Sequence, residues 1–256
     1  FEGSEANPVF TVADGVLWAS QNAMVRKIEI IKMRGQATLP GLHTFRINGE
    51  GLQIFPRAIM GATLAPKADG GPKALKRMSL GVPSLDGMLG GGLPEGYSML
   101  VAGPAGSGKS ILATNFLAEG ARRGEPGIIA AFEKSPSQSI NPKLDALVRT
   151  GLLGVIDTRS LDLSIDETLH DLTTMIKRMQ ARRVVIDSLS GYELALAPTF
   201  RENFRDSLYR MVAVLTGLGI TVLMTSELED RYTDLRFSPH GAAFLTDAII
   251  VQRYIE

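Results

Sequence analysis

Hydrophobic and polar side chains alternate in the first part of the chain. Ile28 and Ile30 are separated by Glu29 and preceded by Lys27, which gives a period of two. Alternation of this kind is typical of a β-strand with one covered face. Residues 1–57 are therefore predicted to be β-rich.

A hairpin is predicted where Asn48-Gly49 interrupts this alternation. The Asn-Gly pair favours the tight turn that joins two antiparallel strands. The hydrophobic positions that face one another across it are Phe45, Ile47, Leu52 and Ile54. Hairpins of this size are too small to form a hydrophobic core of their own.

Residues 58–77 follow no regular period. Pro66, Pro72 and the pair Gly70-Gly71 prevent a regular element, and much of the remainder is Ala and Lys. This composition is typical of a linker.

From residue 78 to residue 256, short apolar runs of strand length alternate with helical patterns. This alternation indicates βαβ units and a three-layer α/β domain with a mostly parallel sheet. The predicted strands are Met99–Ala102, Ile128–Phe132, Val155–Asp157, Val184–Ile186, Ile220–Met224 and Ala248–Val251. Two predicted helix faces are formed by Ile165, Leu169, Leu172, Ile176 and Met179, and by Phe204, Leu208, Met211 and Leu215.

Composition narrows the class of protein. The chain has 256 residues, 27 Lys+Arg against 27 Asp+Glu, and no cysteine. Zero net charge gives no general attraction to nucleic acid or anionic lipid, and the missing cysteine excludes disulfides and thiolate metal sites. No apolar run approaches the roughly 20 residues that span a bilayer. We therefore expect a soluble, cytoplasmic protein without a membrane partner.

A phosphate site is predicted at residues 103–110, which read GPAGSGKS and fit G-x-x-x-x-G-K-[ST] at every fixed position. Backbone N–H groups of such a loop and the N-terminus of the following helix attract phosphate. Lys109 would reach the β- and γ-phosphates of a nucleotide, and Ser110 would bind Mg²⁺. The alternative is a glycine-rich turn without a ligand.

Two acids end predicted strands beside this loop. Asp187 follows an apolar strand and is placed to hold Mg²⁺, unless it caps the next segment. Glu133 follows Ile128–Phe132 and could act as the base, unless it is a solvated loop residue. Thr225, Ser226 and Glu227 follow a further strand and are candidates for sensing the γ-phosphate or for a cap.

The chain resembles the KaiC-like family of circadian clock ATPases and kinases, within the RecA-type P-loop ATPases. The resemblance is carried by residues 78–86 (MSLGVPSLD), 90–96 (GGGLPEG), 132–136 (FEKSP), 186–190 (IDSLS), 245–247 (LTD) and 28–35 (IEIIKMRG). It covers nearly the whole chain and implies a RecA-like P-loop NTPase domain that binds ATP and Mg²⁺.

The resemblance also implies site residues and partners. The phosphates would be wrapped by Gly103, Gly106, Ser107, Gly108, Lys109, Ser110 and Ile111, with Ser110 and Asp187 on the metal and Glu133 as base. Lys32 and Arg34 would reach the nucleotide of a neighbouring subunit in a homo-oligomeric, hexameric ring. Without the resemblance, Lys32 and Arg34 would be interpreted only as residues on the polar face of a strand. Regulatory protein partners are also implied.

The order of the segments gives a domain prediction. Residues 1–57 would close a preceding KaiC-like ATPase domain, 58–77 would be the linker, and 78–256 would be a P-loop ATPase domain whose own closing hairpin lies beyond Glu256. Two departures stand out. Lys134 replaces the second of two adjacent glutamates, which predicts slow turnover, and Ala243-Phe244 replace the Ser-Thr pair that clock proteins phosphorylate.

These observations predict a ring-forming, Mg²⁺-dependent ATPase whose nucleotide state controls oligomer packing and partner binding. Three alternatives stay open. The chain could be a serine/threonine autokinase, a RecA-like DNA-binding ATPase, or a nucleotide-binding scaffold that does not hydrolyse ATP. The neutral charge argues against DNA.

Overall fold

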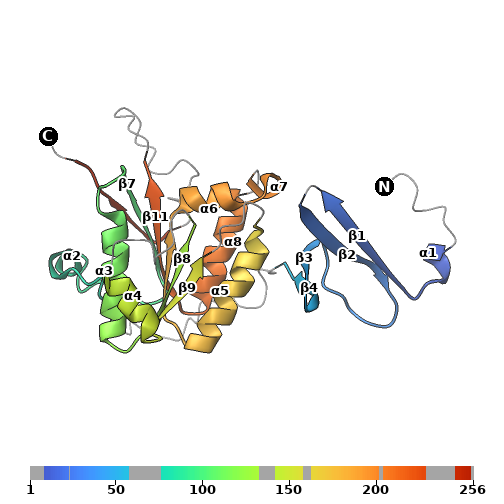
Figure 1. Ribbon diagram of the computed structural model, residues 1–256, viewed down its shortest axis with the longest axis horizontal. Helices are drawn as coiled ribbons and strands as arrows, with labels where there is room; N and C mark the ends of the chain where they lie inside the picture. Colours follow the sequence, from blue (N-terminus) through green and yellow to red (C-terminus); the bar gives the residue numbers. More distant parts are fainter. Residues whose placement is uncertain are drawn as a thin grey trace, which may run out of the picture. The chain divides into compact units, whose positions relative to one another are not determined.

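The computed structural model describes residues 9–22, 24–57, 76–132, 142–157, 163–201, 204–228 and 246–254. The chain divides into two compact units, Phe1–Ala58 and Ile59–Glu256 (Figure 1). Of the predicted linker 58–77, residues 58–75 lie outside the described residues, and Arg77 begins a short strand. In the described part of the chain, no helix is long and apolar enough to span a membrane.

The first unit is a four-stranded antiparallel sheet in the order β1-β2-β3-β4. Its elements are α1 (Val9–Val12), β1 (Gly15–Asn22), β2 (Val25–Met33), β3 (His43–Asn48) and β4 (Gly51–Phe55). The predicted hairpin is confirmed, because Phe45 pairs with Ile54 and Ile47 pairs with Leu52. Asn48 pairs with Gly51, so the tight turn has two residues.

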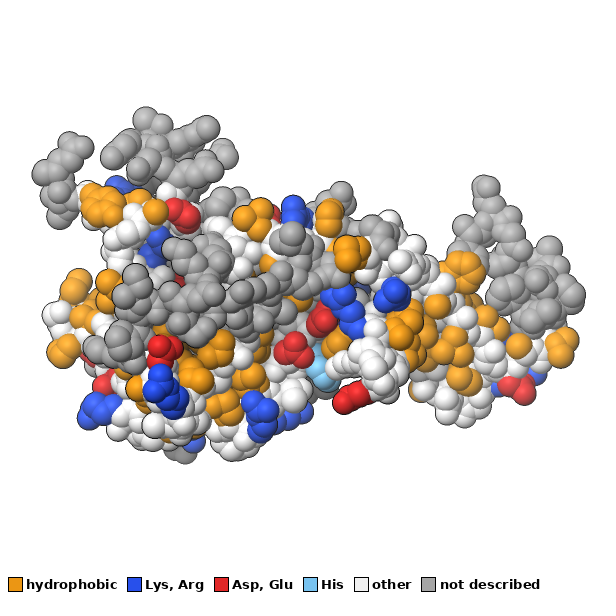
Figure 2. All heavy atoms as spheres, in the orientation of Figure 1, with side chains coloured by type: hydrophobic (Ala, Val, Ile, Leu, Met, Phe, Trp, Pro, Cys, Tyr) orange, Lys and Arg blue, Asp and Glu red, His pale blue; other side chains and the backbone are white. Residues whose placement is uncertain are grey.

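This sheet buries few hydrophobic side chains. Among the described residues of the first unit, the buried hydrophobic ones are Val25, Phe45 and Phe55. Hydrophobic side chains on the surface of this unit can be followed in Figure 2. The exposed ones in its strands are Leu17, Trp18, Ile31, Ile47, Leu52 and Ile54. Apolar surface of this extent is a candidate for contact with another protein surface.

The second unit is built on a six-stranded sheet in the order β12-β7-β11-β10-β8-β9, with every pairing parallel. Its strands are β7 (Ser98–Gly103), β8 (Gly127–Ala131), β9 (Leu153–Asp157), β10 (Arg183–Asp187), β11 (Thr221–Glu227) and β12 (Ala248–Val251). All six predicted strands are present. The predicted α/β class is therefore confirmed.

Helices cover both faces of this sheet (Figure 1). The helices α3 (Lys109–Arg122) and α4 (Pro142–Arg149) pack together on one face, and α5 (Ile165–Met179) and α8 (Phe204–Gly217) pack on the other. Both predicted helix faces are confirmed, since Leu172 and Leu208 at their centres are fully buried. The elements of the second unit that the sequence pattern does not predict are α4, β5 (Arg77–Met78), α2 (Pro83–Met88), β6 (Leu93–Pro94), α6 (Leu189–Ala195) and α7 (Pro198–Arg201).

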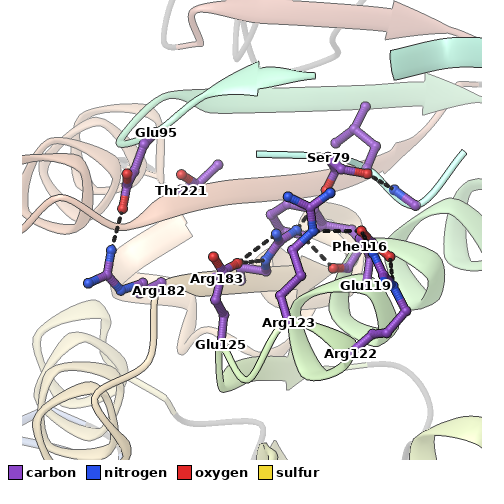
Figure 3. Close-up of polar contacts among 12 residues, drawn as sticks. Ser79, Glu95, Phe116, Glu119, Arg122, Arg123, Glu125, Arg182, Arg183 and Thr221 are labelled. Atoms are coloured by element: carbon purple, nitrogen blue, oxygen red, sulfur yellow. Dashed lines mark hydrogen bonds and ion pairs between the residues drawn. The ribbon is translucent and has the colours of Figure 1, made fainter. Parts of the chain in front are cut away.

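A buried arginine joins three parts of the second unit. The Arg183 side chain, at the start of β10, is 0% exposed. Its guanidinium donates to Ser79 O at 2.7 Å and Phe116 O at 3.1 Å, and it lies 4.7 Å from the Phe116 ring centroid. Glu125 accepts two further bonds, at 2.8 and 3.1 Å (Figure 3). The strand, helix α3 and the segment before α2 thus share one cation.

The contacts of Arg183 predict a large loss of stability when its charge is removed. In Arg183→Met, two buried carbonyls and Glu125 lose their partner, so the free energy of unfolding should fall by about 3 kcal/mol or more. Urea unfolding measures this change.

The matched control is Arg182→Met at the preceding position. Arg182 Nη1 pairs with Glu95 Oε1 at 2.7 Å, but its side chain is 52% exposed. Removal of an exposed pair should change stability by less than about 1 kcal/mol. Equal losses in the two variants would contradict the structural role given to Arg183.

Candidate phosphate-binding site

The predicted phosphate loop connects β7 to α3, and its glycines have distinct structural reasons. Gly106 and Gly108 have φ angles of 76° and 98°. Positive φ angles of this size favour glycine, because glycine has no Cβ to clash with the backbone. At Gly103, a Cβ would come 2.7 Å from Ser107 Oγ and 2.8 Å from Gln252 O. Steric and conformational limits therefore explain all three glycines of the loop.

Lys109 folds back over this loop. Its Nζ donates to Gly103 O at 2.8 Å and to Pro104 O at 2.7 Å, so the ammonium lies against the two residues that open the motif. Ser110 and Ile111, in the first turn of α3, are exposed. The first N–H groups of a helix have no partner within it and are available to an anion. The seven predicted loop residues thus share one strand-to-helix turn, as their sequence adjacency requires.

The structure places Asp187 at the same edge of the sheet as this loop, two strands away. Strand β11 lies between β7 and β10, and Glu227 of β11 pairs with Gly103. Parallel strands bring their carboxyl ends to one edge, which is where α/β proteins bind ligands. The alternative role of Asp187 as a helix cap is wrong, because Ser188 caps α6 and accepts from Gly191 N at 3.1 Å.

Thr225 has a role that the sequence did not reveal. The three residues expected to follow a strand, Thr225, Ser226 and Glu227, belong to β11 itself. The Thr225 hydroxyl is buried and donates to Asp187 Oδ1 at 2.5 Å. Thr225 therefore orients the carboxylate of Asp187, and it caps no helix. Only the pairing of β10 with β11 brings these two side chains together.

Glu133 lies outside the described residues, and its role as base stays a prediction. The chain just before it is described: Ala131 pairs with Asp187 across β8 and β10, and Phe132 N donates to Asp187 O at 3.2 Å. The centroids of the Phe132 and Tyr192 rings are 4.3 Å apart.

A short segment after β12 contacts the phosphate loop from the other side. Ser107 Oγ donates to Gln252 Oε1 at 3.2 Å, and Tyr254 OH donates to Ala105 O at 2.8 Å. Neither Gln252 nor Tyr254 belongs to a recognisable motif. The sequence signal that could have found them is their place directly after a strand predicted to lie in the same sheet.

Lys32 and Arg34 lie in the first unit, at and just after the end of β2. Both donate to Thr11 O, from Lys32 Nζ at 3.4 Å and from Arg34 Nη2 at 3.0 Å. Arg34 Nη1 also pairs with Asp14 Oδ1 at 3.3 Å. Their predicted reach into a neighbouring subunit's site stays a prediction.

The oxygen ligands available here suit magnesium. The described residues contain no group of three or more His, Cys, Asp or Glu side chains that could hold a metal ion. Mg²⁺ rarely needs such a cage, because it is usually bound through one or two protein oxygens, substrate phosphates and water. The Ser110 hydroxyl and the Asp187 carboxylate fit that pattern.

Comparison with known proteins agrees with the site. The sequence model of the family described as "ATPase: KaiC" matches residues 78–256. The chain is 30% identical over 238 residues to the circadian clock oscillator protein KaiC of Picosynechococcus sp. and to that of Rippkaea orientalis, and 28% identical to that of Acaryochloris marina. Each match covers 90% of this chain and 44% of the relative, so the chain spans less than half the length of these proteins.

The bond between Thr225 and Asp187 predicts an energetic coupling between the two side chains. A double-mutant cycle with Thr225→Val and Asp187→Asn should give a coupling of about 1 to 2 kcal/mol in the free energy of unfolding, since hydrogen bonds to charged groups are strong. The cycle pairing Thr225→Val with Asp145→Asn on α4 should be additive within about 0.5 kcal/mol. Additivity in both cycles would show that Thr225 does not hold Asp187.

Proposed function

Because the chain belongs to the KaiC family of P-loop ATPases, we propose that it binds ATP with Mg²⁺ and hydrolyses it slowly. The observation that carries this proposal is the phosphate loop between β7 and α3, with Asp187 at the same edge of the sheet. A further part of the proposal is that the nucleotide state controls the packing of a homo-oligomeric, hexameric ring and the binding of partner proteins.

Each residue of the site has a role in this proposal. The loop and the first turn of α3 direct N–H groups at the phosphates, and Lys109 exchanges its carbonyl partners for phosphate oxygens. Ser110 and Asp187 hold Mg²⁺, which neutralises phosphate charge when bound. Glu133 orients and deprotonates the attacking water. Thr225 fixes Asp187 through the bond of 2.5 Å.

The first unit completes the site of a neighbouring subunit in the proposed ring. Residues 1–57 would close a preceding ATPase domain, and the exposed apolar strand residues of the unit support contact with another protein surface. Lys32 and Arg34 would supply the cations that reach the neighbour's nucleotide. They would first have to leave Thr11 O and Asp14, to which they are bonded.

Autophosphorylation is the alternative outcome of the same chemistry, with a protein hydroxyl in place of water. The positions of the clock proteins' Ser-Thr pair are Ala243-Phe244 in this chain and carry no hydroxyl. Incubation with [γ-³²P]ATP distinguishes the two reactions, because hydrolysis releases labelled phosphate whereas autophosphorylation labels the chain. DNA binding that weakens steeply with salt would favour the RecA-like alternative.

Lys109→Ala should greatly weaken nucleotide binding and abolish nucleotide-dependent assembly. The variant removes the cation that neutralises the β- and γ-phosphates, so affinity for Mg·ATP should fall by about 100-fold or more. Calorimetry measures the affinity, and light scattering with and without ATP measures the assembly.

The matched control is Lys177→Ala, on the exposed surface of α5. It should bind and assemble like the parent chain. If Lys109→Ala kept the parent's affinity and oligomer profile, the proposed site would be wrong.

Lys134→Glu should raise the steady-state rate of phosphate release. The substitution restores an adjacent pair of carboxylates, and a neighbouring carboxylate raises the pKa of Glu133, whereas a neighbouring lysine lowers it. A higher pKa makes Glu133 a stronger base. Glu133→Gln in the same background should remove the gain. An unchanged rate in Lys134→Glu would refute the proposed cause of slow turnover.

A further inference from the structure

We propose that Gln252 and Tyr254 are positioning residues of the phosphate loop, a role that rests on the proposed function of that loop. They approach it from β12, whereas Asp187 lies on the opposite side of β7, beyond β11. Their side chains bond to the Ser107 hydroxyl and to Ala105 O, both in the loop. They hold the loop backbone and the Ser107 hydroxyl in the conformation that receives phosphate.

Tyr254 fixes one peptide plane of the loop. Its hydroxyl donates to Ala105 O at 2.8 Å. The carbonyl of Ala105 and the N–H of Gly106 belong to one planar trans peptide and point in opposite directions. A carbonyl held toward Tyr254 therefore turns the Gly106 N–H away from Tyr254, and in the proposed role this N–H is directed at phosphate.

The Tyr254 hydroxyl also packs closely against the backbone of Gly106. A Cβ on Gly106 would lie 2.8 Å from the Tyr254 hydroxyl oxygen, so the end of the Tyr254 side chain lies directly against the loop backbone. The Tyr254 side chain is nevertheless 64% exposed. Its hydroxyl anchors the loop while most of the ring faces solvent, so its removal should leave the core intact.

Gln252 fixes the next part of the loop. Ser107 Oγ donates to its side-chain oxygen at 3.2 Å. Gln252 N also donates to Ala102 O at 2.8 Å, which continues the parallel pairing of β12 with β7 to the edge of the loop. The side chain of Gln252 is thereby held beside Ser107.

Asp247 sets the register of this segment at the opposite end of β12. Its Oδ2 accepts from Ser98 N and from Ser98 Oγ, both at 2.8 Å, and Asp247 N donates to Ser98 O at 3.0 Å. Because β12 is fastened to the start of β7, its continuation must arrive at the loop that follows β7. The position of Gln252 and Tyr254 is therefore a consequence of strand register.

The experiment compares Mg·ATP with inorganic tripolyphosphate plus Mg²⁺ as ligands of the whole chain, by calorimetry. Tyr254→Phe keeps the ring and removes only the bond to Ala105 O. Because a net hydrogen bond corresponds to about a two- to tenfold change in an equilibrium constant, both ligands should bind about two- to tenfold more weakly. Tyr209→Phe, at an exposed tyrosine of α8, is the matched control and should leave both affinities unchanged.

A second measurement tests the Ser107 and Gln252 pair. The single variants Ser107→Ala and Gln252→Met and their double variant form a cycle in tripolyphosphate affinity. If Gln252 acts through Ser107, the loss in the double variant should be smaller than the product of the two single losses. Independent, multiplying losses would overturn the role of Gln252.

The outcomes separate this role from the alternatives. Unchanged affinities in Tyr254→Phe would overturn the role of Tyr254. A loss for ATP without a loss for tripolyphosphate would also overturn it, because it would place Tyr254 against the nucleoside. The role would also be overturned if the melting temperature of Tyr254→Phe, measured without ligand, fell far enough to account for the loss of affinity. If the parent chain bound neither ligand, the proposed function itself would fail, whatever the Tyr254 variants did.

Discussion

A buried positive charge at the start of β10 constrains the geometry of the whole second unit. Arg183 is fully enclosed, and burial of a charge is tolerable only when its hydrogen-bonding groups have partners. Those partners come from the segment before α2, from α3 and from the turn after α3. Helix α3 begins at the phosphate loop and β10 ends at Asp187. One cation therefore holds together the two elements that carry the two halves of the candidate site.

The candidate site depends on how strands are ordered in space as well as on its motif. Because β11 lies between the loop strand and the strand of Asp187, a residue of β11 is available to orient the carboxylate, and Thr225 does so. On the other side, β12 brings Gln252 and Tyr254 to the loop. The loop thus lies between the ends of β12 and β11, and each of these neighbouring strands contributes a different contact to the candidate site.

Much of this could be predicted from the sequence, and the remainder depends on long-range pairing. The glycines of the loop, Lys109 and Ser110 are adjacent in the chain, so a local motif identifies them. Asp187 was found because it ends an apolar strand. The bond from Thr225 to Asp187 and the bond from Tyr254 to the loop could not be predicted, because the partners in each bond become neighbours only through strand register. Arg183 follows the same rule, since nothing in its local sequence indicates that Glu125 and two carbonyls surround it.

The place of β7 between β12 and β11 has a consequence for how the chain is made. Ser98 and Asp247, which join β7 to β12, are 149 positions apart in the sequence, and β11 also follows β7 only after more than half of the unit has been synthesised. The N-terminal part of a chain leaves the ribosome first. Contacts between distant positions form late, because the loops between those positions are costly to close. The phosphate loop therefore leaves the ribosome early, yet both strands that flank it must still be translated. Nascent chains that stop before residue 221 contain the complete motif but lack both strands that flank it.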